Sequence, residues 1–92
     1  MINVNEYFNG NAKSLAFNNS QGKFTAGVLL KGEYEFSTSS KEWMTLTAGK
    51  WEIELPNGTK KQYDIFEACE IPSGITFKVY ALEDSSYLCR YV

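Results

Sequence analysis

Hydrophobic and polar side chains alternate over short stretches of the chain, which is the period of β-strands and not of helices. From Lys23 to Thr38 the pattern predicts one apolar face and one face carrying Lys31, Glu33 and Glu35. The expected apolar positions are Val28, Leu30, Tyr34 and Phe36. A second stretch has the same pattern, with apolar positions at Met44, Leu46, Trp51, Ile53 and Leu55.

Turn residues separate these stretches. Pro56-Asn57-Gly58 predicts a tight hairpin, because Asn and Gly tolerate the positive φ that such turns require. Further breaks at 72–74 and 83–85 divide the C-terminal third into more strands. Short strands at regular spacing predict an all-β fold, either a sandwich or a small antiparallel β-barrel. At 92 residues the chain is expected to form a single domain spanning 1–92.

Composition and charge restrict the class of protein. The hydrophobic fraction of 43% is that of a folded domain, and 9 basic against 11 acidic residues give a net charge of −2. This balance argues against nucleic acid as a partner, which calls for a basic surface. No run approaches the ~18 apolar residues of a membrane span, so no membrane association is expected. The N-terminal residues lack the layout of a secretion signal, and we therefore expect a cytoplasmic protein.

The chain contains no histidine, and this removes several kinds of site. Serine-hydrolase and cysteine-protease triads need an imidazole base, and most mononuclear transition-metal sites need imidazole ligands. Only two cysteines are present, too few for a thiolate zinc site, so no metal is expected. In the absence of a secretion signal, Cys69 and Cys89 are expected to be reduced and mostly buried.

Two spacings are similar to the motifs of cupins, which are small antiparallel barrels. Phe36-x-Thr38-x3-Glu42-x6-Gly49 resembles the first cupin motif, with Phe36 and Thr38 where its two histidines would stand. Pro72-x-Gly74-x2-Phe77 resembles the second motif, again with the histidine replaced. The resemblance implies a β-barrel or jelly roll of the cupin type that has lost its metal ligands.

Within this alignment Glu42 is a polar residue directed toward the pocket. An alternative interpretation is an ordinary solvated carboxylate at the end of a strand, since carboxylates are rarely buried. If Glu42 faces the apolar interior, desolvation should raise its pKa unless a cation lies nearby. Arg90 is the only arginine and the candidate for that cation; equally, it can pin a sheet edge or contact a second subunit.

Longer segments resemble one particular cupin-fold family. Together, "NEYFNGNAKSLAF", "AGVLLKGEYEFST", "EWMTLTAG" and "SSYLCRY" are similar to the pyrimidine/purine nucleoside phosphorylases. The resemblance implies an enzyme that needs no cofactor and uses inorganic phosphate as co-substrate. It implies cleavage of purine and pyrimidine nucleosides to a free base and a pentose 1-phosphate.

Residue chemistry then suggests roles for such a reaction. We expect Arg90 to bind phosphate and Glu42 to accept hydrogen bonds from ribose hydroxyls. The expected substrate-binding residues are Tyr34, Ser37, Thr38, Phe77, Tyr87 and Tyr91. Strand alternation, however, places Tyr87 and Tyr91 on the face opposite Arg90, so all three share a pocket only through a bulge or a dimer contact.

Two other interpretations remain open. The segment before Pro72 is shorter than in members of the family. In the first alternative this shortening has abolished turnover, and the protein is a non-catalytic module that binds a nucleoside or sugar. A purely structural dimerisation domain is the other. For the phosphorylase a homodimer is expected, because small barrels with exposed strand edges tend to associate.

Overall fold

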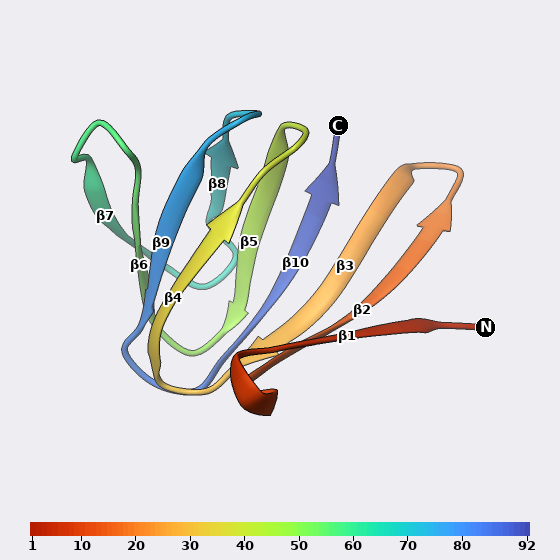
Figure 1. Cartoon of the computed structure of the whole chain (residues 1–92), viewed down its shortest axis with the longest axis horizontal. Coiled ribbons are helices and arrows are strands. Elements are labelled where there is room, and N and C mark those ends of the chain that lie inside the picture. The colour runs from red at the N-terminus through yellow and green to blue at the C-terminus, as the bar shows by residue number, and fades with distance from the viewer.

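Two antiparallel β-sheets pack against each other in the computed structural model, which describes residues 1–92 (Figure 1). The six-stranded sheet has the order β1 (Asn3–Tyr7), β2 (Ala12–Asn19), β3 (Gly22–Leu29), β10 (Ser85–Tyr91), β5 (Glu42–Ala48), β8 (Ala68–Ile71). The four-stranded sheet has the order β4 (Gly32–Ser37), β9 (Thr76–Ala81), β6 (Trp51–Glu54), β7 (Lys60–Tyr63). A short 3₁₀ turn, η1 (Phe8–Gly10), joins β1 to β2. The predicted all-β antiparallel fold is confirmed; its two sheets form a cupin-like sandwich and do not close into one continuous barrel.

The core lies between the sheets and is built from the inward positions of alternating strands. Trp51 and Ile53 of β6 and Met44 and Leu46 of β5 are buried, as their spacing predicts. Each such side chain contributes about 1.5–3 kcal/mol through burial of its apolar surface. The four-stranded sheet is therefore held against the six-stranded one mainly by hydrophobic contact.

The prediction for residues 28–30 was wrong by one position. Val28 and Leu30 are exposed, whereas Leu29 between them is fully buried. β3 ends at Leu29 and the chain then passes to the other sheet, where β4 begins at Gly32. Alternation does not continue across this corner. In the second half of β3 the buried positions have odd numbers, whereas the buried Tyr34 of β4 has an even number.

The predicted hairpin at Pro56-Asn57-Gly58 is confirmed and joins β6 to β7. The Gly58 N–H donates to the Leu55 carbonyl at 2.9 Å, and Gly58 has φ 89°, a conformation that favours glycine. The Asn57 side-chain oxygen accepts from the Thr59 N–H at 2.9 Å.

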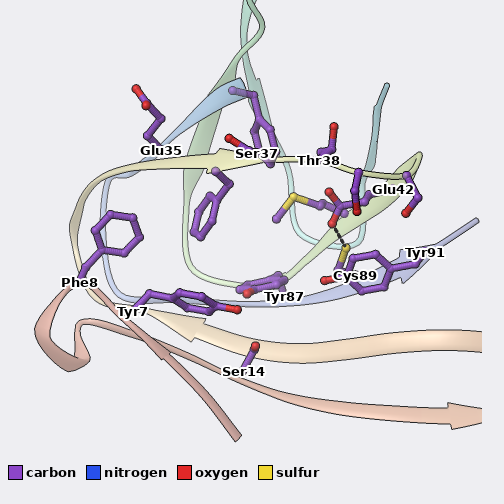
Figure 2. Close-up of a pocket in the computed structure, with 15 residues that line it drawn as sticks. Tyr7, Phe8, Ser14, Glu35, Ser37, Thr38, Glu42, Tyr87, Cys89 and Tyr91 are labelled. Carbon is purple, nitrogen blue, oxygen red and sulfur yellow. Dashed lines mark hydrogen bonds between the residues drawn. The ribbon is translucent and has the colours of Figure 1, made fainter. Parts of the chain in front are cut away.

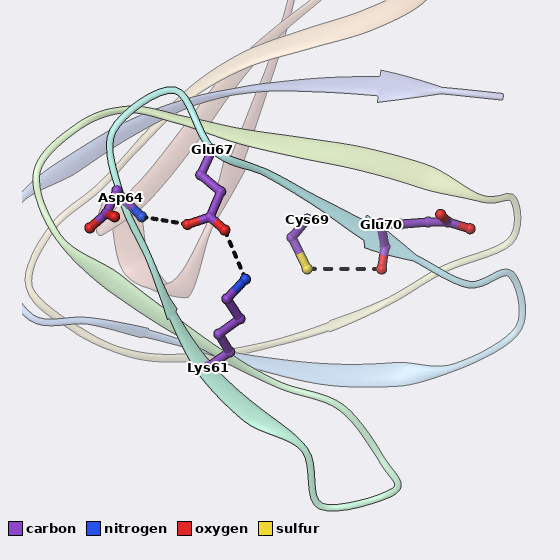
Figure 3. A network of polar contacts seen from close by, with 5 residues as sticks. All are labelled: Lys61, Asp64, Glu67, Cys69 and Glu70. Carbon is purple, nitrogen blue, oxygen red and sulfur yellow. Dashed lines mark hydrogen bonds and ion pairs between the residues drawn. The ribbon is translucent and has the colours of Figure 1, made fainter.

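The chain crosses from β7 to β8, between the two sheets, through a loop that Figure 3 shows. Lys61 Nζ donates to Glu67 Oε2 at 2.8 Å, and the other carboxylate oxygen of Glu67 accepts from the Asp64 N–H at 3.0 Å. The Phe66 N–H donates to the Leu46 carbonyl at 2.6 Å, which attaches the loop to β5. Because the Lys61–Glu67 pair is largely exposed, the backbone bond is the firmer of these attachments.

Both thiols are buried and unpaired, as predicted. Cys69 of β8 and Cys89 of β10 each lie opposite Met44 of β5, one on either side. Two strand spacings, about 10 Å, separate their backbones. This exceeds the roughly 7 Å limit for a disulfide, so the fold itself keeps the two cysteines apart.

The outer face of the six-stranded sheet carries an exposed apolar row. Val4, Leu15, Ala26 and Leu88 lie opposite one another on β1, β2, β3 and β10, and all four are exposed. Contiguous apolar surface of this kind often marks an interaction site. The homodimer expected from the sequence stays a prediction. No helix in the structure approaches the length and hydrophobicity that crossing a bilayer requires.

Thr38 holds the hairpin between β8 and β9 in place. Its hydroxyl donates to the Pro72 carbonyl at 2.7 Å and accepts from the Ile75 N–H at 3.1 Å. Its backbone N–H donates to the Ile75 carbonyl at 2.9 Å, and its carbonyl accepts from the Gly74 N–H at 3.1 Å. Thr38 therefore makes most of the hydrogen bonds that attach the Pro-x-Gly hairpin to the end of β4, and the Ser73 hydroxyl adds one by donating to the Ser39 carbonyl at 3.3 Å.

Replacing Thr38 by Val should lower the free energy of unfolding by about 1–3 kcal/mol, because it removes both side-chain hydrogen bonds and leaves backbone groups unpaired. Urea denaturation measures this. Thr45→Val is the matched control, since Thr45 is half-buried on β5 and its side chain makes no hydrogen bond; a change within about 0.5 kcal/mol is expected there. Equal stability of the two variants would show that Thr38 does not anchor the hairpin.

Candidate active site

A pocket of about 320 Å³ lies between the two sheets, in the size range of small-molecule sites, roughly 300–1,000 Å³. Of its 15 lining residues, 8 are hydrophobic. The lining residues come from the end of β1 with η1, from the end of β4 with the loop that follows, and from the inward faces of β2, β5, β9 and β10. Figure 2 shows Phe8 and Tyr7 at one end and Glu42, Cys89 and Tyr91 at the other.

The polar end of the pocket is centred on the buried carboxylate of Glu42, which is 9% exposed. Glu42 is the first residue of β5 and lies opposite Tyr91 of β10. The thiol of Cys89 donates to Glu42 Oε1 at 3.2 Å. Burial raises the pKa of the Glu42 carboxyl, and hydrogen bonding with the Cys89 and Tyr91 side chains offsets only part of this effect. The site therefore holds a desolvated acid without a neighbouring cation.

Cys89 acts here as a hydrogen-bond donor. The pKa of its thiol lies well above the ordinary value. Burial is the main cause, and the negative charge of Glu42 raises it further. A thiol in such surroundings keeps its proton at neutral pH and is a poor nucleophile. Cys89 is thus suited to orient the Glu42 carboxylate.

Tyr87 forms the floor of the pocket between its two ends. Its ring lies directly over Gly27 of β3, where a Cβ would overlap the ring atoms, and packs on Trp51 with ring centroids 5.7 Å apart. Burial raises the pKa of Tyr87 to about 12, so the phenol stays protonated. A glycine at position 27 is what allows this ring to lie flat against the sheet.

Aromatic rings make up the other end. Phe8 packs edge-to-face against Phe36 with centroids 5.8 Å apart, and Tyr7 does so at 6.3 Å. Phe8 has φ 53°, an unusual backbone conformation for a bulky residue, and this directs its ring to the pocket rim. A local strain of this kind persists only where the surrounding structure holds it.

Comparison with known proteins identifies the family. The model of the family described as pyrimidine/purine nucleoside phosphorylase matches residues 2–91. The chain belongs to this family. It is 41% identical over 92 residues to the pyrimidine/purine nucleoside phosphorylase of Hahella chejuensis, and 43% identical over 91 residues to that of Rhodopirellula baltica. The two alignments cover 99% and 98% of this chain and 99% of each relative.

A solved structure shows the same architecture. A protein of unknown function from Vibrio parahaemolyticus superposes with a TM-score of 0.95 at 31% identity, covering 100% of this chain and 99% of that one. The family resemblance expected from "GEYEFST" and "SSYLCRY" is thus confirmed over nearly the whole chain.

Six of the residues expected in the family's site line the pocket. They are Ser37, Thr38, Glu42, Phe77, Tyr87 and Tyr91. Several of their polar atoms already have partners: the Thr38 hydroxyl is bound to the hairpin, and the Tyr91 hydroxyl lies 3.2 Å from Thr25 Oγ1. Ser37 Oγ lies 3.0 Å from Thr76 Oγ1 on the exposed rim. What these side chains bind stays a prediction.

Arg90 and Tyr34 lie outside the pocket. Arg90 is exposed on the opposite face of β10, as the alternation of Tyr87 and Tyr91 indicated, and its guanidinium donates to the Gln21 carbonyl at 3.2 Å. The structure therefore does not support Arg90 as a phosphate ligand in this pocket or as a cation beside Glu42. Tyr34 is buried behind Phe8 and donates to the Leu30 carbonyl at 2.6 Å, a structural role.

Sequence reasoning missed part of the lining. Cys89 was recoverable, because it alternates with Tyr87 and Tyr91 on β10. Tyr7 and Phe8 were not, because their position depends on η1, whose left-handed residues follow no strand period. Ser14 enters from β2 through the pairing of β2 with β3.

The residues do not form a metal centre. The positions where cupin histidines would stand, Phe36, Thr38 and Phe77, all line this pocket. No group of three or more His, Cys, Asp or Glu side chains is placed to hold a metal ion. Two phenyl rings and one hydroxyl group, those of Phe36, Phe77 and Thr38, stand where the metal-binding histidines of cupins would lie.

Replacing Gly27 by Ala should displace the Tyr87 ring and lower the free energy of unfolding by about 1–3 kcal/mol, the usual cost of overpacking. Urea denaturation measures the loss. Ala26→Ser, on the exposed face of the same strand, is the control and should change stability by less than about 0.5 kcal/mol. If Gly27→Ala is as stable as the native protein, the ring is not confined by β3.

Replacing Glu42 by Gln should stabilise the protein at pH 7 by about 1 kcal/mol, because a neutral amide costs less to bury than the desolvated carboxylate. The folded-state pKa of Glu42 is raised, so the native protein loses stability as pH rises from the unfolded pKa, about 4.3, through the folded value. The gain from Gln should therefore be present at pH 7 and vanish below pH ~4. Urea midpoints at both pH values test this, with the exposed Glu83→Gln as control. If the stability gain of Glu42→Gln is the same at both pH values, the pKa of Glu42 is not raised in the folded protein.

Proposed function

We propose that the protein is a nucleoside phosphorylase that cleaves purine and pyrimidine nucleosides with inorganic phosphate, without a metal or other cofactor. The observation that carries this proposal is the division of one pocket into an aromatic end and a buried carboxylate end. Its relatives in Hahella chejuensis and Rhodopirellula baltica bear the name of this activity.

The aromatic end suits a nucleobase. Phe8, Phe36 and Tyr7 present ring surfaces against which a base can stack. Stacking is tolerant because every base has a π-face. A base subsite of this kind would accept both purines and pyrimidines.

The carboxylate end suits the ribose. Glu42 lies in a largely apolar pocket, where it can accept hydrogen bonds from ribose hydroxyls and stabilise positive charge that develops on the sugar ring. Cys89 fixes the orientation of the carboxylate by donating to Oε1. A preorganised charge of this kind interacts more strongly than in water, because Glu42 is largely removed from solvent.

The reaction forms one bond and breaks one. A phosphate oxygen bonds to the anomeric carbon as the glycosidic C–N bond breaks, and the electron pair of that bond goes to the base nitrogen. The proton that the base acquires comes from the monohydrogen or dihydrogen phosphate. No electron acceptor or donor is needed, so the residues present suffice for positioning and charge stabilisation.

A second candidate function is non-catalytic binding of a nucleoside or sugar. The observation in its favour is that the pocket lining includes two carboxylates, Glu35 and Glu42, and no Lys or Arg. An anion has no obvious counter-charge within the pocket itself. Binding without phosphate-dependent turnover would identify this function.

The test is incubation of the purified protein with uridine, thymidine, adenosine, guanosine and inosine, with and without phosphate, followed by separation of bases from nucleosides. Free base with pentose 1-phosphate only in the presence of phosphate is the expected result. Glu42→Gln should reduce kcat about a hundredfold, the usual effect of removing one preorganised electrostatic group, and Glu83→Gln should leave it unchanged. Base release without phosphate would indicate a hydrolase, and binding without release would indicate a binding module.

A further inference from the structure

A second cavity adjoins the pocket and has the opposite electrostatic character. It has a volume of about 490 Å³ and shares two lining residues, Tyr7 and Tyr91, with the pocket. Its lining includes Lys23 and no Asp or Glu, whereas the pocket includes two carboxylates and no cation. The two cavities therefore divide the charges that a reaction between a nucleoside and an anion requires.

The strand register explains why Lys23 lies beside the pocket. Tyr91 of β10 lies opposite Lys23 of β3 on one side and Glu42 of β5 on the other. Residues opposite one another in antiparallel strands share a face, so all three project from the concave side of the sheet. Two strand spacings, about 10 Å, separate the backbones of Lys23 and Glu42. The Lys23 ammonium lies 5.4 Å from the centroid of the Tyr91 ring, which is the partition between the two cavities.

Lys23 and its neighbours are available to a ligand. Lys23 makes no ion pair. The lysines that do are Lys13, Lys41, Lys61 and Lys78. Asn18 of β2 lies opposite Lys23, and Asn3 of β1 lines the same cavity. Neither amide side chain has a hydrogen-bond partner within the chain, and each can donate two N–H groups.

We propose that this second cavity is the phosphate subsite of the enzyme, with Lys23 as the charged ligand and the Asn3 and Asn18 amides as donors. This proposal rests on the function proposed above and adds the location of the co-substrate. Tyr91 separates phosphate from the buried Glu42 carboxylate, and the phosphate approaches the ribose past the two residues that both cavities share, Tyr7 and Tyr91. A lysine provides the compact positive charge commonly found at phosphate sites.

The test compares Lys23→Met and Lys23→Arg with the native protein. Lys60→Met is the matched control, because the Lys60 ammonium also lies over a tyrosine ring, that of Tyr80, at 4.0 Å from its centroid, on β7 of the other sheet. Two readouts are used: the affinity for inorganic phosphate from ³¹P NMR titration, which needs no turnover, and the separate KM values for phosphate and nucleoside.

Lys23→Met should weaken phosphate binding, and raise the KM for phosphate, at least about tenfold, with the nucleoside KM changed less than about twofold. Lys23→Arg should keep part of the affinity, and Lys60→Met should leave both values unchanged. Native phosphate affinity in Lys23→Met, or no phosphate binding by the native protein, would overturn the subsite.

A further arm separates inorganic phosphate from the phosphate group of a nucleotide, since both have the same charge chemistry. Titration with uridine monophosphate in place of inorganic phosphate decides between them. If binding of uridine monophosphate depends on Lys23 and binding of inorganic phosphate does not, the co-substrate assignment is overturned. If phosphate binds through Lys23 but no base is released, the subsite stands and the proposed catalytic function fails. If base release depends on phosphate but not on Lys23, the function stands and the subsite fails.

Discussion

The pairing of β10 with both β3 and β5 determines most of what this structure presents to a ligand. β10 is the last strand in the sequence, yet it lies in the middle of the six-stranded sheet. It joins the β1–β2–β3 segment to β5 and β8, and without it the sheet would be two separate pieces. Every second residue of β10 faces the pocket, so Tyr87, Cys89 and Tyr91 enter it together. The same constraint sends Arg90 to the outer face.

The pocket keeps a carboxylate in an environment that disfavours its charge. Glu42 is buried, and this burial raises its pKa; hydrogen bonding from the Cys89 and Tyr91 side chains offsets only part of the rise. A thiol is a weak donor, so the carboxylate is oriented without being neutralised. Such an arrangement costs stability and is typical of functional sites, where a group must keep interaction capacity for a ligand.

The cupin-like fold of this chain carries no cluster of three or more side chains placed to hold a metal ion. Phe36, Thr38 and Phe77 occupy the wall where metal-binding imidazoles would stand. Two of these replacements are aromatic, which makes the wall apolar, and the third anchors the Pro-x-Gly hairpin through its hydroxyl. The fold supplies a concave face between two sheets, and the side chains on that face decide whether it binds a metal or an organic ligand.

The sequence by itself determined the all-β class, the hairpin at Pro56-Asn57-Gly58, the family, and most of the residues on β5 and β10 that face the pocket. The family follows from the resemblance of longer segments such as "GEYEFST" and "SSYLCRY". The other features are consequences of period-two alternation and of turn chemistry, both of which are local. Only the tertiary structure decided the rest. The change of sheet after Leu29 shifted the buried register, and the left-handed residues of η1 placed Phe8 on the pocket rim. Lys23 came beside Tyr91 through pairing between strands far apart in the sequence, which no local pattern encodes.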